Sequence, residues 1–430
     1  MNTGEGGAGD AGDGVARRVA QELIDGRYAA IAARFDATMA AMLSADKLGA
    51  SWEPAAGACG QIQRMGPSRF ETAGGRPVVV VPLVFEHASL DLRVAVNADG
   101  QVTGLFVAPA ASQEVWRPPA YAAAGAVEVA VTVGPLALPG WLVSPPGPGP
   151  FPCAVLVHGS GASDADETMG PNKPFRDLAL GLAARGVATL RYDKRTHAHP
   201  ELFTVDSRYS VQEETVDDAV AAVRSAAASP GVDPQRVWVL GHSWGGTLAP
   251  RIAAAAAPDV AGVVILAGAT RPLQDLLVDQ MRYLHGPDAP TVVATEAFAQ
   301  VVRDPGLAAG QTVEVLGAKL PGSYFLDLRA YDPARTAAGL QIPILVLHGE
   351  RDYQVRRADY DGWQRALAGH PRAQLALYPA LNHLFQEGAG RSAPSEYARP
   401  DQHVAVEVIE DIAAFIKAQA AERGAAHSPG

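Results

Sequence analysis

Residues 241–246 combine a serine, a histidine and glycines in a pattern that can activate a nucleophile. The segment reads Gly241-His242-Ser243-Trp244-Gly245-Gly246 and contains Gly-x-Ser-x-Gly. An apolar run precedes it and an alanine-rich stretch follows, so we expect a strand, a sharp turn and a helix. Such a turn exposes the serine hydroxyl, and the glycines let neighbouring backbone approach closely. The pattern predicts Ser243 as a nucleophile; the alternative is that Ser243 only caps the helix.

Two residues further along the chain could activate this serine. Asp352 follows the apolar run 343–347, and His383 follows the strand-like run 374–378. Each of the three residues therefore lies after a separate predicted strand, where open α/β sheets bind their ligands. The chain order Ser…Asp…His is typical of α/β-hydrolases.

The chemistry that these residue types allow is acyl transfer. His383 would take the proton of Ser243 as the hydroxyl attacks a carbonyl, and Asp352 would hold the imidazole tautomer and stabilise the imidazolium. Asp327 and Asp332 also follow Ser243 in the chain. Only Asp352 comes directly after a predicted parallel strand, so it is the expected acid.

A fourth part of the site is expected in the loop 158–161, which reads His-Gly-Ser-Gly after an apolar run. A loop of this kind supplies one backbone N–H of an oxyanion hole, and the residue after the nucleophile supplies the other. The predicted donors are the N–H groups of Ser160 and Trp244. His158 is interpreted as a structural histidine that bonds the loop backbone.

Beyond the turn at Ser243, the stretch from about residue 127 to 422 resembles an α/β-hydrolase of the esterase/lipase superfamily. Four motifs make it similar to a bacterial carboxylesterase group with a small extra N-terminal domain. They are Val157-His-Gly-Ser-Gly161, Asp164-Ala-Asp-Glu167, Gly170-Pro-Asn-Lys-Pro-Phe175 and Arg191-Tyr-Asp-Lys-Arg195. The resemblance implies hydrolysis of small carboxylic esters with no metal and no organic cofactor.

Composition narrows the set of partners. The net charge of −11 gives no basic surface for nucleic acid and disfavours anionic membranes. No apolar run approaches the roughly 18 residues of a membrane span. Cys59 and Cys153 are too few for a disulfide framework, and no signal peptide is seen at the start. The expected protein is cytoplasmic and binds a small ester or thioester, with monomer and homodimer both left open.

The chain is predicted to divide into two domains between disordered tails. The expected segments are a tail at 1–13, a small α+β domain at 14–115, an α/β-hydrolase domain at 116–422 and a tail at 423–430. In the first domain, helical spacing over 14–47 precedes strand-like runs at 77–85, 90–96 and 102–107. Helices followed by an antiparallel meander suggest a fold similar to nuclear-transport-factor-2-like domains.

The second domain is predicted to hold a doubly wound, mostly parallel sheet. A hairpin at 127–133 and 136–143 opens it, and apolar strands then alternate with helices, as in βαβ units. The expected strands are 153–158, 187–192, 236–242 and 260–267, and the expected helices are 175–185, 211–228 and 245–257.

The alternation stops between residues 269 and 341, which predicts a helical lid at about 270–340. Its candidate substrate-binding residues are Leu277, Met281, Tyr324 and Phe325. The alternative for Leu277 and Met281 is that they only bury the lid on the body. Tyr331 is expected in the core.

Three other functions use the same fold. An acyl-transferring or cyclising thioesterase or lactonase-type enzyme would use the same three residues, with another nucleophile in place of water. A peptidase of the prolyl-oligopeptidase type is disfavoured, because the first 115 residues are too few for a propeller. A non-catalytic binding protein is disfavoured by the complete set of site residues.

Overall fold

The computed structural model describes residues 6–73, 76–86, 89–109, 116–204, 209–400 and 402–426. The chain forms two compact units. The first contains residues up to Trp116 together with Met169–Asn172 and Pro394–Asp401, and the second contains the rest. The two short segments were predicted in the second domain. They join each other through Asn172, whose Nδ2 donates to the carbonyl of Tyr397 at 2.7 Å. A contact across such a distance in sequence leaves no local pattern.

In its described residues, the first unit places four helices before five antiparallel strands. The helices are α1 (Gly6–Ile24), α2 (Tyr28–Ala32), α3 (Ala37–Met42) and α4 (Ala45–Ala58). The strands are β1 (Ile62–Met65), β2 (Arg69–Ala73), β3 (Arg76–Phe85), β4 (Ser89–Val96) and β5 (Val102–Pro109). Their order is β1-β3-β4-β5, with β2 also paired to β3. The predicted α+β class is confirmed, whereas the nuclear-transport-factor-2-like fold stays a prediction.

Both predicted tails are wrong where the structure describes them. Helix α1 already begins at Gly6, and helix α14 (Val406–Ala426) continues through residues 423–426. Residues 1–5 and 427–430 lie outside the described residues. Buried side chains such as Val19 and Ile412 anchor the two helices. Once a helix is anchored, each further residue adds one hydrogen bond at little cost, so the helix extends past its apolar pattern.

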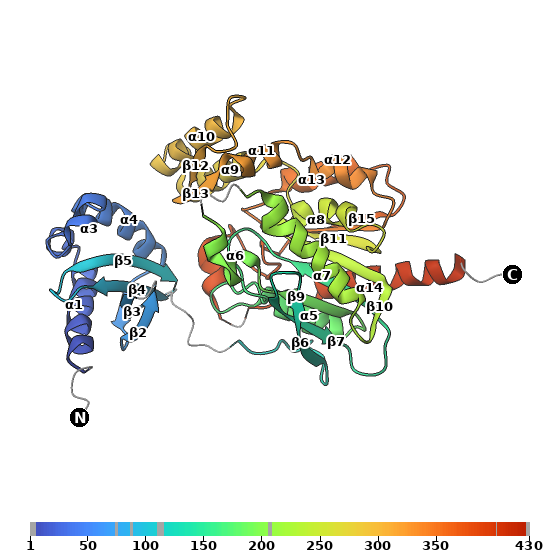
Figure 1. Ribbon diagram of the computed structural model, residues 1–430, viewed down its shortest axis with the longest axis horizontal. Coiled ribbons are helices and arrows are strands. Elements are labelled where there is room, and N and C mark those ends of the chain that lie inside the picture. The colour runs from blue at the N-terminus through green and yellow to red at the C-terminus, as the bar shows by residue number, and fades with distance from the viewer. Residues whose placement is uncertain are drawn as a thin grey trace. The chain divides into compact units, whose positions relative to one another are not determined.

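The second unit is built on an eight-stranded sheet within the described chain (Figure 1). Its strands are β6 (Val127–Val133), β7 (Leu138–Ser144), β8 (Phe151–Val157), β9 (Ala188–Tyr192), β10 (Val232–His242), β11 (Gly262–Leu266), β14 (Ile344–Gly349) and β15 (Ala373–Tyr378). The order is β15-β14-β11-β10-β8-β9-β7-β6. All pairs from β15 to β9 are parallel, and β7 is antiparallel to β9 and β6. The predicted α/β-hydrolase sheet is confirmed.

Apolar side chains leave both faces of this sheet, because successive strand residues point to opposite sides. From β8, Val155 and Val157 join one core cluster while Ala154 and Leu156 join the other. Helices α7 (Asp217–Ala227), α8 (Trp244–Ala255) and α13 (Arg357–Leu367) contribute to the first cluster, and α5 (Pro174–Ala183) and α14 to the second. Shorter turns are α6 (Arg195–Ala198), η1 (Pro200–Leu202), the π-helical η3 (Gln212–Val216) and, in the first unit, η4 (Pro394–Ala398).

An insertion between β11 and β14 occupies the predicted position of the lid. It consists of α9 (Leu273–His285), α10 (Pro290–Arg303), the hairpin β12 (Thr312–Val315) and β13 (Ala318–Pro321), α11 (Gly322–Arg329) and α12 (Pro333–Gly339). The sequence did not predict the hairpin. Of the helices that the structure describes, none is both long and apolar enough to cross a membrane.

Candidate active site

Ser243 lies at the turn between β10 and α8 in a strained conformation. Its φ of +51° and ψ of −112° fall outside the regions that L residues ordinarily occupy. A Cβ added to Gly241 would lie 2.1 Å from the carbonyl oxygen of Gly245, and one added to Gly245 would lie 2.1 Å from that of Val157. Only glycine therefore allows this turn. The side chain of Ser243 caps no N–H of α8, so the interpretation as a helix cap is wrong.

Asp352 and His383 are hydrogen-bonded to each other. Asp352 follows β14, His383 follows β15, and Oδ2 of the carboxylate lies 2.6 Å from Nδ1 of the imidazole. The other oxygen accepts from the N–H groups of Gln354 and Val355, at 2.8 and 2.9 Å. Both side chains are buried. Because Nδ1 is the donor to Asp352, Nε2 is the nitrogen that can accept a proton.

His242, the residue before the nucleophile, ties these loops to the end of β10. Its Nε2 lies 2.9 Å from the carbonyl oxygen of His383, and the two rings are 4.8 Å apart between centroids. Since a carbonyl can only accept, Nε2 of His242 is the donor. The structure thus brings the carboxyl ends of β10, β14 and β15 together, as predicted for parallel strands.

The two competing acids have other partners. Asp327, in α11, forms an ion pair with Arg251 at 3.0 Å. Asp332 accepts the backbone N–H of Arg335 at 2.9 Å and caps α12. Asp352 is the one of the three that bonds His383.

The loop after β8 lies against the nucleophile. A Cβ on Gly159 would sit 3.3 Å from Cβ and 3.7 Å from Oγ of Ser243, so the glycine backbone faces the hydroxyl. Ser160 follows in the same loop and is exposed. Trp244 is the first residue of α8, and its N–H therefore has no acceptor within the helix.

His158 has the structural role predicted for it. Its Nε2 lies 3.0 Å from the carbonyl oxygen of Asp164 in the same loop. Burial lowers the pKa of His158 to about 4, against the smaller opposing effect of Glu167. A histidine that stays neutral and bonds backbone holds the loop in place.

Sequence reasoning missed two charged residues that hold Gly159. Glu167 accepts the Gly159 N–H through Oε1 at 2.6 Å, and Lys194 donates to the Gly159 carbonyl at 3.1 Å. Both side chains are buried. They belong to motifs that carried the family resemblance. Lys194 lies two residues after the predicted strand 187–192, and Glu167 lies in the loop that follows the predicted strand 153–158. Their charges were the available signal, because Glu and Lys are rarely buried unless paired.

Glu167 also pairs with His242. Its Oε2 lies 2.9 Å from His242 Nδ1. Burial raises the pKa of Glu167, but His242 and the Gly159 N–H outweigh it and leave the pKa below its usual value. Burial likewise lowers the pKa of His242, and Glu167 outweighs it, so that this pKa is raised. Both shifts favour an ion pair.

A pocket of about 480 Å³ opens beside Trp244, under the insertion. Thr247 lines it, with apolar side chains from the insertion: Leu273, Phe325, Leu328 and Tyr331. Of the predicted substrate-binding residues, Phe325 lines this pocket. Leu277 and Met281 are half-buried on α9 outside its lining.

Two tyrosines of the insertion differ in how they match the expectation from the sequence. Tyr324 is buried outside this lining, and its hydroxyl donates to Oε2 of Glu214 at 2.7 Å. Tyr331, expected in the core, packs against the first core cluster and also lines the pocket, where its hydroxyl donates to the carbonyl of Thr247 at 2.8 Å. The sequence favoured the pocket for both Tyr324 and Phe325, and only Phe325 is in its lining.

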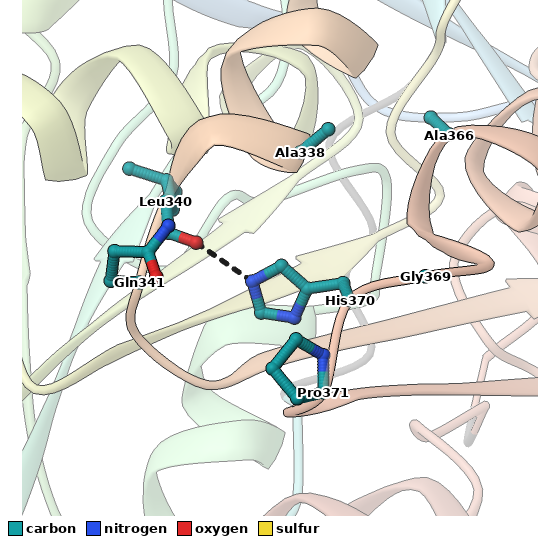
Figure 2. A pocket seen from close by; sticks show the side chains of 7 residues that line it. All are labelled: Ala338, Leu340, Gln341, Ala366, Gly369, His370 and Pro371. Atoms are coloured by element: carbon teal, nitrogen blue, oxygen red, sulfur yellow. Dashed lines mark hydrogen bonds between the residues drawn. The ribbon is translucent and has the colours of Figure 1, made fainter.

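A second pocket, of about 260 Å³, lies elsewhere (Figure 2). Its lining includes Leu340 and Gln341 before β14, and His370 and Pro371 before β15. His370 Nε2 lies 2.8 Å from the carbonyl oxygen of Leu340. These are the amino ends of the strands, whereas Ser243, Asp352 and His383 occupy the carboxyl ends. This pocket is therefore separate from the candidate site.

Comparison with known proteins identifies the family to which this fold belongs. Residues 154–399 match the model of the α/β hydrolase family, and residues 16–105 match a family described as a protein of unknown function, DUF3887. Over 336 residues the chain is 39% identical to Esterase EstD of Thermotoga maritima, covering 78% of each protein.

Solved structures resemble it more distantly. Est1E from Butyrivibrio proteoclasticus is 16% identical, covering 68% of this chain and 99% of that one, with a TM-score of 0.45. An esterase of Pyrobaculum calidifontis is 19% identical, covering 68% and 86%, with a TM-score of 0.46. On the family match and the similarity to the Thermotoga esterase, this chain belongs to the α/β-hydrolase family, as its motifs predicted.

Proposed function

We propose that the protein is a serine hydrolase that cleaves small carboxylic esters through an acyl-enzyme on Ser243. The observation that supports this most is the 2.6 Å bond between Asp352 and His383, at the strand ends where the strained turn of Ser243 also lies. The similarity to a bacterial esterase supports the same activity.

The residues divide the reaction between them. Nε2 of His383 takes the hydroxyl proton as Ser243 attacks the ester carbonyl, and Asp352 stabilises the imidazolium. The N–H groups of Ser160 and Trp244, with the positive N-terminal end of α8, stabilise the oxyanion. His383 then protonates the leaving alcohol. Water, deprotonated by the same histidine, attacks the acyl-enzyme. The bond between the acyl carbon and Ser243 Oγ breaks, His383 returns the proton to the serine oxygen, and the acid is freed.

The experiment is a substitution combined with a covalent probe. Ser243→Ala should lower kcat for a p-nitrophenyl ester by about 10⁴-fold or more without changing the unfolding midpoint. A fluorophosphonate should label the native protein and leave Ser243→Ala unlabelled. Ser229→Ala, which removes a hydroxyl bonded to the Ser225 carbonyl, is the matched control and should be labelled normally. A folded Ser243→Ala protein with near-native turnover would exclude the proposal.

The insertion is proposed as a lid, and the pocket beside Trp244 as the site of the acyl chain. Apolar lining from Leu273 and Phe325 supports this choice. Leu273→Trp should fill the pocket and lower kcat/KM for long acyl esters by about 10-fold, leaving acetate esters unaffected. Leu277→Trp, one turn further along α9 and outside the lining, is the control. If Leu277→Trp changed the chain-length preference instead, the sequence prediction for Leu277 would be preferred.

The proposed partner is a small ester or thioester, and the proposed compartment is the cytoplasm. Cys59 and Cys153 are both buried as free thiols, which fits a reducing compartment. A fluorescent fusion or cell fractionation checks the location.

A further inference from the structure

The peptide between Gly159 and Ser160 is held by a buried lysine. Nζ of Lys194 donates to the carbonyl of Gly159 at 3.1 Å. This carbonyl and the Ser160 N–H belong to one peptide unit, and in a trans peptide they point in opposite directions. A hydrogen bond that fixes the Gly159 carbonyl therefore also fixes the direction of the Ser160 N–H.

Lys194 is itself fixed on several sides. Its backbone N–H donates to the Ser163 carbonyl at 3.0 Å, within the same loop as Gly159. Its Nζ also lies 2.9 Å from Oε1 of Glu214. Oε2 of Glu214 accepts the hydroxyl of Tyr324 at 2.7 Å. All three side chains are buried, so the ammonium has few alternative positions.

The other side of Gly159 is also held. Glu167 accepts its N–H at 2.6 Å, so both polar groups of this glycine bond a buried charged side chain. Glycine is the residue most free to change its backbone angles. Two charge-assisted hydrogen bonds remove that freedom where the loop meets Ser243.

We propose that Lys194 is a positioning residue that orients and polarises the oxyanion-donating peptide, and that Glu214 and Tyr324 hold the ammonium in place. The inference rests on the proposed esterase function. A cation on the carbonyl draws electron density through the peptide and makes the Ser160 N–H a stronger donor, because hydrogen bonds in a chain reinforce one another. A donor fixed beforehand also needs no reorganisation when the oxyanion forms.

Through Tyr324, this chain of contacts begins in the insertion. Tyr324 belongs to α11, Glu214 to the π-helical turn η3, and Lys194 to the loop after β9. π-Helical turns are uncommon and often mark functional sites. Tyr324, predicted to bind substrate, is thus assigned a role through the oxyanion loop.

The test removes the ion pair without leaving a lone buried charge. Lys194→Met with Glu214→Gln neutralises both partners, a change that buried pairs tolerate better than loss of one. We expect kcat for a small ester to fall roughly 10- to 100-fold, below the loss for a deleted donor, with KM within about 2-fold. The control is Arg195→Met with Asp218→Asn, which neutralises the neighbouring, partly buried pair, bonded at 2.5 and 2.6 Å. It should leave kcat unchanged.

A second measurement separates positioning from a structural role. The ester is compared with its thionoester, whose carbonyl oxygen is replaced by sulfur, a weak hydrogen-bond acceptor. The native enzyme should prefer the oxygen ester, and the Lys194→Met/Glu214→Gln variant should lose most of that preference. A purely structural role would slow both substrates equally and leave the ratio unchanged.

The outcomes also separate this inference from the proposed function. If the native protein hydrolyses esters and is labelled on Ser243, yet the folded double variant keeps its kcat and its oxygen preference, only the role of Lys194 is overturned. If the native protein neither turns over esters nor reacts with the fluorophosphonate, the proposed function itself fails. Tyr324→Phe should lower kcat by only a few-fold, because Glu214 still holds the ammonium.

Discussion

Two buried carboxylate–histidine pairs lie side by side at the carboxyl ends of the strands. Asp352 and His383 are 2.6 Å apart, Glu167 and His242 are 2.9 Å apart, and the two imidazoles are 4.8 Å from each other between centroids. In each pair the carboxylate contacts Nδ1. Residue type, burial and distance therefore do not distinguish a catalytic pair from a supporting one.

The second nitrogen of each imidazole ring, Nε2, distinguishes the two pairs. Nε2 of His242 is occupied as a donor to the carbonyl of His383, so it cannot accept a proton from a serine. Asp352 engages only Nδ1 of His383 and leaves Nε2 for that task. We infer that Glu167 and His242 form a charged clamp that joins the loops of Gly159, Ser243 and His383.

The largest expected effect comes from breaking the pair of Asp352 and His383. Asp352→Asn keeps the shape of the side chain but favours the wrong imidazole tautomer, so kcat should fall about 10⁴-fold. Steady-state kinetics with a p-nitrophenyl ester, together with a thermal unfolding curve, measures this.

The competing acids supply the controls for Asp352. Asp327→Asn should lose only its ion pair with Arg251 and keep most of its activity. If Asp327→Asn or Asp332→Asn were the more damaging change, the assignment of Asp352 would be wrong.

The next effect concerns the clamp. Glu167→Gln removes the charge facing His242 while keeping the size of the side chain, and it weakens the bond to the Gly159 N–H. We expect kcat to fall about 10-fold, and the free energy of unfolding to fall by about 1–3 kcal/mol. Activity assays and denaturant unfolding measure the two quantities. A loss of activity as large as that of Asp352→Asn would mean that both pairs take part in proton transfer.

The difference between the pairs shows how far sequence reasoning reaches. Ser243, Asp352 and His383 could be predicted because each follows an apolar strand, and the sheet topology alone brings such strand ends together. The clamp could not be predicted in the same way. Glu167 meets His242 only because of the directions of two side chains, one from a loop and one from the end of β10, that are far apart in sequence.

The pH dependence of stability sharpens the comparison. The lowered pKa of Glu167 contributes stability above the ordinary glutamate value of about 4.3, and this is lost as the pH falls through the lowered pKa. The raised pKa of His242 contributes stability below about 6.5, and this is lost as the pH rises through the raised pKa. The free energy of unfolding of the native protein should therefore exceed that of Glu167→Gln by the largest amount between about pH 4.3 and 6.5. A difference independent of pH would show that the two groups do not form an ion pair.

Other differences between expectation and structure have similar causes. The sequence predicts Tyr324 and Phe325 as substrate-binding residues; both are buried, but only Phe325 lines the pocket beside Trp244. The hydroxyl of Tyr324 meets Glu214, which lies 110 positions earlier in the chain. Aromatic residue type favours burial, whereas the partner of a buried side chain depends on the tertiary fold.

The smallest expected effect comes from Asp332, a carboxylate whose partner is a backbone N–H and not a histidine. Asp332 caps α12 by accepting the N–H of Arg335 at 2.9 Å, so its charge serves a helix end. Asp332 also lines the pocket beside Trp244, so the assay uses an acetate ester, whose acyl group is too short to fill that pocket. Asp332→Ala should lower the free energy of unfolding by about 1 kcal/mol, as the loss of an N-cap does, and leave kcat for the acetate ester unchanged. Denaturant unfolding and the ester assay measure both. Asp332 follows the nucleophile in sequence, as Asp352 does. If Asp332→Ala lost activity without losing stability, the catalytic acid would not be identified by its position directly after a strand.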